Sequence, residues 1–356
     1  MKHPTLESLA LPVLALAGGL GLFGLFVWFN GHDPVQAWGL LFRGAFGDAF
    51  SLQNTLQRAA PLMLTALCVA IPARAGLTVI GGEGALVLGG LACASLPYVL
   101  PLPAGAAGTL MLLLAAAAAG AAWIALAGWL RQWRGVNETI SSLLLGYIAI
   151  ALFKHIVEGP LRDPASLNKP STLPLEDNLR IGTLGGWDVH WGLVWGVALC
   201  VVAGLWLLAT THGFATRVVG GNPRAAQLVG LPASRLIITA CALGGACAGL
   251  AGGIEVAAVH TAANASLIVG LGYTGILVSF VARHQPLAIV PVAILFGGFL
   301  AAGSLLQRRM GLPDASVQVL MGFCFVFILA SEALRGRLGE LFSIRRPMPA
   351  TAGAAA

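Results

Sequence analysis

The feature that most limits the fold of this chain is a series of long apolar runs. Several of them exceed the roughly 20 residues that cross the hydrocarbon core of a bilayer. Charged residues make up only 10% of the 356 positions and lie mainly between the runs, whereas a soluble domain carries about a quarter. The sequence therefore predicts an all-α integral membrane protein, with residues 1–356 forming one transmembrane domain.

The spacing of the runs predicts a polytopic bundle of about ten transmembrane helices. The first run is too long for a signal-peptide core and lacks a small-residue cleavage site, so we expect it to be retained. The expected spans lie near 9–29, 59–73, 76–100, 104–130, 139–153, 191–210, 236–259, 265–282, 287–306 and 315–334.

The distribution of Lys and Arg predicts the orientation. With a cytoplasmic N-terminus, twelve of the 20 basic residues fall in inside segments and eight in outside segments. This excess follows the positive-inside rule, so both termini are expected in the cytoplasm. The net charge of +6 is then a consequence of topology. We expect membrane lipid to surround the chain. The positive charge does not indicate a nucleic-acid partner.

One inside connection, residues 211–235, is basic and contains no acidic residue. Asn222 is a suitable N-cap and Pro223 suits a first helical turn, so we expect a short helix over 223–229, ended by Gly230. An exposed short helix is suited to docking in a groove of a soluble partner. The alternative is an ordinary interfacial loop that obeys the positive-inside rule.

Two carboxylates, Glu83 and Glu255, interrupt the apolar runs, and each lies beside glycines. An ionisable group at membrane depth usually faces the bundle interior or a wet cavity, and broken helices build such sites in transporters. The alternative role is structural, with the carboxyl bonded to backbone donors at a half-helix N-terminus. Ser141 and Ser142, which follow the capping residue Asn137, are also candidates to line a pathway.

Several motifs carry a resemblance to a known family. In GFATRVVGGNPRAAQLVGL (213–231), Ala225-Ala226, three residues and Gly230 resemble the coupling loop of ATP-binding-cassette (ABC) importer permeases. The order of residues is closest to the simple-sugar and nucleoside branch. GLTVIGGEGALVLGG (76–90), RGVNETISSLLLGYIA (134–149), GACAGLAGGIEV (245–256) and GYTGILVSFVARHQPLAIV (272–290) are similar to further segments of that branch.

The resemblance implies the membrane subunit of an ATP-driven importer for a neutral polar small molecule. The first choice of cargo is a nucleoside or a simple sugar. Its implied partners are a cytoplasmic ABC ATPase, a second permease subunit (identical or related) and an extracytoplasmic solute-binding protein, at a bacterial inner membrane. The implied ATPase-coupling residues are Arg217, Asn222, Pro223, Arg224, Ala225, Ala226 and Gly230. The candidates for the translocation pathway are Glu83, Ser141, Ser142, Glu255 and Asn264.

The chain departs from the family pattern at four positions. Arg224 replaces the usual leading Glu of the coupling motif, and Val79, Ala85 and Thr274 replace residues common in nucleoside permeases. These changes leave the cargo open. A second hypothesis also stays open: an ion-coupled secondary transporter with Glu83 or Glu255 as its proton carrier.

The chain has no chemistry of its own to drive transport. No phosphate-binding G-x-x-x-x-G-K-[ST] loop occurs in it. The six cysteines lie in apolar runs without ligand spacing and are expected to be small buried side chains. We therefore expect no catalytic residues, no cofactor and no metal, and an energy source in a partner.

Overall fold

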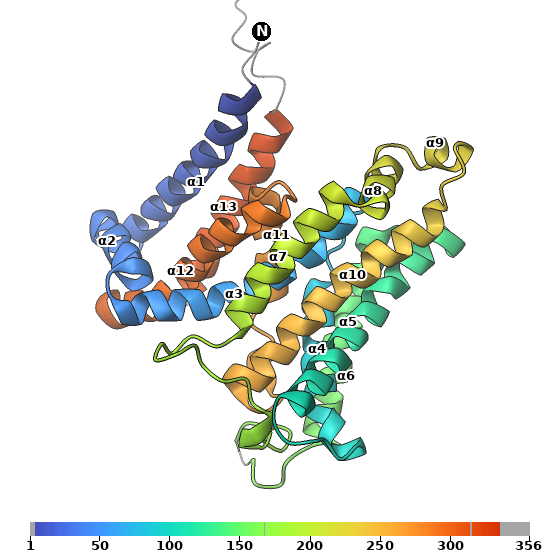
Figure 1. Cartoon of the computed structure of the whole chain (residues 1–356). Helices are drawn as coiled ribbons and strands as arrows, with labels where there is room; N and C mark the ends of the chain where they lie inside the picture. The colour runs from blue at the N-terminus through green and yellow to red at the C-terminus, as the bar shows by residue number, and fades with distance from the viewer. Residues whose placement is uncertain (1–3, 167, 314, 335–356) are drawn as a thin grey trace, which may run out of the picture.

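The computed structural model describes residues 4–166, 168–313 and 315–334. Within them the chain is almost entirely helical (Figure 1). The α-helices are α1 (Pro4–Phe29), α2 (Pro34–Phe46), α3 (Ala49–Arg74), α4 (Gly82–Val99), α5 (Ala106–Arg134), α6 (Glu138–Glu158), α7 (Gly192–Ala209), α8 (Thr211–Gly221), α9 (Pro223–Leu228), α10 (Ala233–Ile254), α11 (Leu271–Val281), α12 (Pro286–Met310) and α13 (Ala315–Leu334). The 3₁₀ turns η1 (Asp177–Leu179) and η3 (Ala265–Leu267) and the π-helical η2 (Glu255–His260) complete the set.

Seven helical segments of the described chain are long and apolar enough to cross a membrane: 49–74, 82–99, 106–134, 138–158, 192–209, 233–260 and 286–310. Three further apolar segments are shorter, at 13–29, 265–281 and 315–331. All ten predicted spans therefore coincide with apolar helical segments. A multi-pass membrane protein is confirmed.

Three predicted boundaries were wrong. The span expected over 59–73 belongs to a helix that begins at Ala49, because the Asp48 carboxylate caps it by accepting from the Ser51 amide (2.7 Å). The span expected from residue 76 begins only at Gly82. The span expected over 265–282 is interrupted before Leu271, since Gly270 adopts a positive φ of 83°.

Two helices lie where the sequence predicted only connections. Helix α2 follows α1, and the Asp33 carboxylate caps it by accepting from the Val35 amide (2.9 Å). Helix α8 precedes the predicted short helix in the 211–235 segment. Neither reaches the length of a membrane span, so a search for long apolar runs cannot find them.

Glycines allow α10 to pack directly against its neighbours. A Cβ on Gly249 would overlap with the carbonyl oxygen of Ala116 in α5, and one on Gly252 with that of Leu86 in α4. Close backbone approach through small residues is a common way for membrane helices to associate. This packing forms the centre of the α4–α5–α10 group, with α6 against α4 (Figure 1).

The helix ends divide between two sides of the molecule. Helices α1 and α13 run antiparallel, with Gly18 facing Phe327 and Gly19 facing Cys324. The first turn of α1, the last turn of α13 and α8–α9 lie toward one end, and the segment 159–191 lies toward the other (Figure 1). All six cysteines are buried and free, which confirms the burial expected of them.

Candidate functional site

The 211–235 segment is two short helices, α8 and α9, that meet at Asn222. The Asn222 side chain accepts from the amides of Arg224 (3.0 Å) and Ala225 (3.1 Å), and Pro223 occupies the first turn. Gly230 has a φ of 82° just beyond the last turn. The predicted short helix, its cap and its terminating glycine are confirmed to within one residue.

The outer surface of this segment combines apolar and basic side chains. Phe214, Leu228 and Val229 are 60%, 89% and 73% exposed, and the side chains of Arg217 and Arg224 are exposed beside them. Ala226 is fully buried and anchors α9 to the rest of the molecule. Large exposed apolar groups rimmed by polar side chains are typical of surfaces that contact another protein or a membrane.

The inner surface of α8 lies directly on the end of α3. A Cβ on Gly220 would overlap with the carbonyl oxygen of Arg74, and Gly76, at a φ of 78°, faces Gly220 from the same turn. At this point no side chain lies between α8 and α3. Helix α8 and the C-terminal end of α3 are therefore in direct backbone contact.

The end of α3 is in turn tied to the connection between α11 and α12. The Arg74 guanidinium donates to the carbonyl oxygen of His284 from Nε (3.0 Å) and Nη2 (2.8 Å). Arg283 and His284 both adopt positive φ values, 53° and 54°, which are uncommon for residues other than glycine. The connection is thus held in a tight, unusual conformation at the C-terminal end of α11.

The opposite end of α11 is held by Glu83. Its carboxylate accepts from the amides of Gly270 (2.8 Å) and Gly272 (2.6 Å), and the side chain is 1% exposed. An anion is favoured at a helix N-terminus because the unpaired amides and the helix dipole are positive there. Of the two roles considered for Glu83, this geometry is that of the structural carboxyl.

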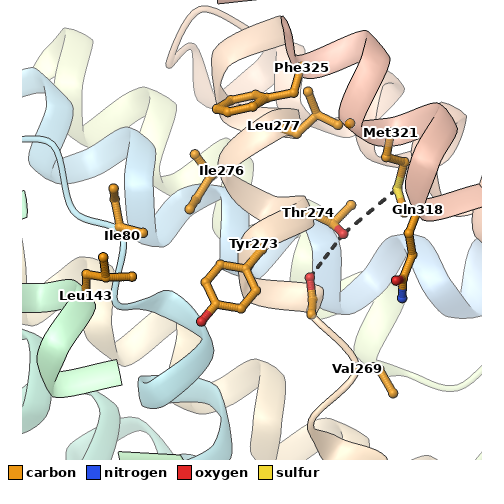
Figure 2. A pocket seen from close by; sticks show the side chains of 12 residues that line it. Ile80, Leu143, Val269, Tyr273, Thr274, Ile276, Leu277, Gln318, Met321 and Phe325 are labelled. Carbon is orange, nitrogen blue, oxygen red and sulfur yellow. Dashed lines mark hydrogen bonds between the residues drawn. The ribbon is translucent and has the colours of Figure 1, made fainter. Parts of the chain in front are cut away.

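A cavity of about 550 Å³ lies along α11. Figure 2 shows its walls, formed by α11, by α13 and by Ile80 and Leu143 from the α4–α6 side. The lining is mostly apolar, and Tyr273, Thr274 and Gln318 supply its polar side chains. The Thr274 hydroxyl donates to the carbonyl oxygen of Gly270 (3.1 Å). A few polar groups in an apolar cleft suit a small organic solute.

None of the five predicted pathway residues lines this cavity, although Glu83 bonds Gly270 in its wall. Ser142 accepts from the Ile80 amide (3.0 Å), and Ser141 donates to the Glu138 carbonyl (3.3 Å). Asn264 caps η3 by accepting from the Ser266 amide (2.8 Å). Ser142 and Glu83 thus bond backbone groups of the lining residues Ile80 and Gly270, and the role of all five residues in transport stays a prediction.

Glu255 has a different environment from Glu83. It lies at the start of the π-helical η2, is 7% exposed, and has a carboxylate oxygen 3.5 Å from Nε2 of His260. The structural alternative considered for it, a carboxyl bonded to backbone donors at a helix N-terminus, does not match this partner. The two carboxylates therefore have different partners: backbone amides for Glu83 and the His260 imidazole for Glu255.

Sequence reasoning missed Tyr273 and Gln318. Tyr273 and Thr274 lie in a segment that the family resemblance had singled out, but nothing in their spacing marked them as lining a cavity. Gln318 is on α13, which approaches α11 only in the tertiary structure. Among the described residues, no group of three His, Cys, Asp or Glu side chains is placed to hold a metal ion.

The fold and the site define a multi-pass membrane permease subunit. Residues 51–329 match the family described as branched-chain amino acid transport system / permease component. The chain belongs to this family of ABC importer permeases, in its sugar and nucleoside branch.

Three relatives place it in that branch. It is 33% identical to the glucose ABC transporter permease protein TsgB13 of Haloferax volcanii, over 96% of this chain and 93% of the relative. It is 29% identical to the guanosine ABC transporter permease protein NupP of Bacillus subtilis, over 94% and 97%. For the nucleoside ABC transporter permease protein NupB of Lactococcus lactis the identity is 26%, over 97% of both chains.

Proposed function

We propose that this chain crosses a bacterial inner membrane ten times, through α1, α3 to α7 and α10 to α13, with both termini in the cytoplasm. An even number of crossings agrees with the antiparallel packing of α1 and α13. It puts the basic α8–α9 segment on the cytoplasmic side, where the positive-inside rule favours it. The segment 159–191 then faces the side from which solute arrives.

The proposed cargo is a neutral polar small molecule, and the first choice is a nucleoside or a simple sugar. The relatives' names support this, as glucose, guanosine and nucleoside permeases. The cavity along α11 supports it as well, because its lining contains hydroxyl, amide and aromatic groups and no charged side chain. A base can stack on Tyr273 or Phe325, and sugar hydroxyls can bond Gln318.

The observation that carries the proposal is the continuous contact between the exposed loop and the cavity. Helix α8 lies on Arg74, Arg74 bonds the α11–α12 connection, and α11 forms a wall of the cavity. A cytoplasmic ABC ATPase that grips α8–α9 can move α11 through these contacts. A second permease subunit and an extracytoplasmic binding protein complete the proposed complex.

The test is co-expression of the permease with its candidate ATPase and binding protein. The ATPase is expected to co-purify with the permease. Arg217→Glu, Asn222→Ala and Arg224→Glu are expected to reduce uptake at least tenfold while ATP hydrolysis continues. Lys154→Gln, an exposed substitution at the far end of α6, serves as the control with unchanged uptake.

Binding-protein thermal shifts with nucleosides and sugars then identify the cargo. Accumulation of solute by the permease alone, abolished by a protonophore, would support the ion-coupled transporter instead. The family assignment does not favour that alternative.

A further inference from the structure

A second cavity, of about 650 Å³, opens where α2, the start of α3 and the end of α12 meet. Its lining is polar and basic, with three arginines, Arg43, Arg308 and Arg309, and one acid among the described residues, Asp48. The Asp48 carboxylate is already engaged with the amide of Ser51 (2.7 Å). The cavity therefore keeps a net positive charge, which the transport mechanism does not use.

The three guanidinium groups have no protein anion within ion-pair distance in the part of the chain described here. Arginine binds phosphate and carboxylate through two parallel hydrogen bonds, and it is the side chain best suited to such anions. Arg308 and Arg309 lie in the last turn of α12. In a membrane, such a helix end lies at the level of lipid headgroups.

An apolar groove of about 250 Å³ lies on the neighbouring face of α2. Its walls include Trp38, Phe42 and Phe46 from α2 and Phe299 from α12. Phe299 precedes Arg308 by nine residues, which places the groove about 14 Å deeper along the helix axis at 1.5 Å per residue. The basic cavity thus lies at the helix end, and the aromatic groove lies deeper along the same helix.

The packing of α2 holds the two cavities side by side. Gly44 of α2 lies against Ala302 of α12, and Gly298 of α12 lies against Ala45 and Phe46. Phe42 is 67% exposed on the outer surface of this pair. The pair therefore presents a fixed arrangement of charge and apolar surface to the membrane.

We propose that this site binds a phospholipid with an anionic headgroup, its phosphate on Arg43, Arg308 and Arg309 and an acyl chain along Trp38, Phe42 and Phe46. The charge selects the headgroup, and the aromatic groove selects a molecule with a hydrocarbon tail. An acidic surface of a partner protein would satisfy the arginines but leave the groove unfilled. The proposal does not depend on the cargo or on coupling to ATP.

Native mass spectrometry of the purified full-length permease, delipidated and then exposed to phosphatidylglycerol or phosphatidylcholine, tests the proposal. The wild type is expected to retain phosphatidylglycerol at least tenfold better than phosphatidylcholine. Arg308→Gln with Arg309→Gln is expected to remove that preference. Lys154→Gln with Arg162→Gln, which removes the same charge from the same end of the helices, is expected to keep it.

A second variant separates lipid recognition from folding. Phe42→Ala alters only an exposed side chain of the groove, and it is expected to weaken phosphatidylglycerol retention several-fold without changing the melting temperature in detergent. Equal retention of the two lipids by the wild type would overturn the proposal. So would arginine variants that retain lipid normally but no longer capture the binding protein, since the arginines would then recognise an acidic protein surface.

Discussion

Glu83 shows how a single carboxylate can determine the position of a whole helix. Its two oxygens accept from the amides of Gly270 and Gly272 at the start of α11, in a site with 1% exposure. A buried donor that loses its partner costs about 1–3 kcal/mol. The helix that lines the cavity therefore depends on a side chain that does not itself line it.

This geometry predicts different outcomes for two substitutions. Glu83→Ala leaves two buried amides unpaired, so we expect a melting temperature in detergent several degrees lower and loss of uptake. Glu83→Gln keeps one acceptor oxygen, so we expect ATP-driven uptake to fall only two- to tenfold. Uptake assays in proteoliposomes with the ATPase measure both. The control is Glu158→Gln, at an exposed position at the end of α6.

A proton-carrier role predicts the opposite pattern. In that case Glu83→Gln would abolish uptake completely while the protein keeps its normal melting temperature. That result would contradict the structural role assigned to Glu83 here.

At the level of elements, the backbones of α8 and the end of α3 are in direct contact. The adjacent residues Gly220 and Gly221 of α8 differ in how close they lie to α3. A Cβ on Gly220 would overlap with the Arg74 carbonyl, whereas a Cβ on Gly221 would meet nothing within 4 Å. The pair offers a matched comparison on the same helix.

We expect Gly220→Ala to reduce uptake at least fivefold, because α8 must shift away from α3 to make room. Gly221→Ala carries the same change in helix propensity and is expected to transport at close to the wild-type rate. ATP hydrolysis and uptake, measured together in reconstituted vesicles, check the prediction. Equal uptake by the two variants would show that the contact does not transmit motion.

At the scale of the whole molecule, the two ends of the bundle carry different surfaces. The α8–α9 segment and the ends of α1 and α13 lie on one side, and the segment 159–191 lies on the other (Figure 1). The described native cysteines are all buried, so an introduced cysteine can be labelled against a low background.

Labelling with a membrane-impermeant maleimide tests the proposed orientation. In intact cells, Asn178→Cys in the 159–191 segment is expected to react, since Asn178 is exposed and the proposed topology places it outside. Gln227→Cys in α9 is expected to react only after the membrane is permeabilised. Reaction of Gln227→Cys in intact cells would reverse the assigned topology.

Features that follow from local chemistry could be read from the sequence. The ten apolar segments and the cap at Asn222 each depend on residues near one another in the chain. Bilayer thickness and helix capping determine them without reference to distant partners. The family resemblance likewise rests on contiguous motifs.

Other features depend on contacts between residues far apart in the sequence, and only the tertiary structure decided them. Glu83 bonds Gly270 and Gly272, which lie 187 and 189 positions later in the chain. Arg74 bonds His284, which lies 210 positions later. The cavity joins α11 to α13, so neither Tyr273 nor Gln318 could be assigned to it beforehand. The sequence alone determined a multi-pass membrane protein, and its contiguous motifs indicated the permease family. The tertiary structure decided which side chains hold α11 and form its cavity, because only folding brings those partners into contact.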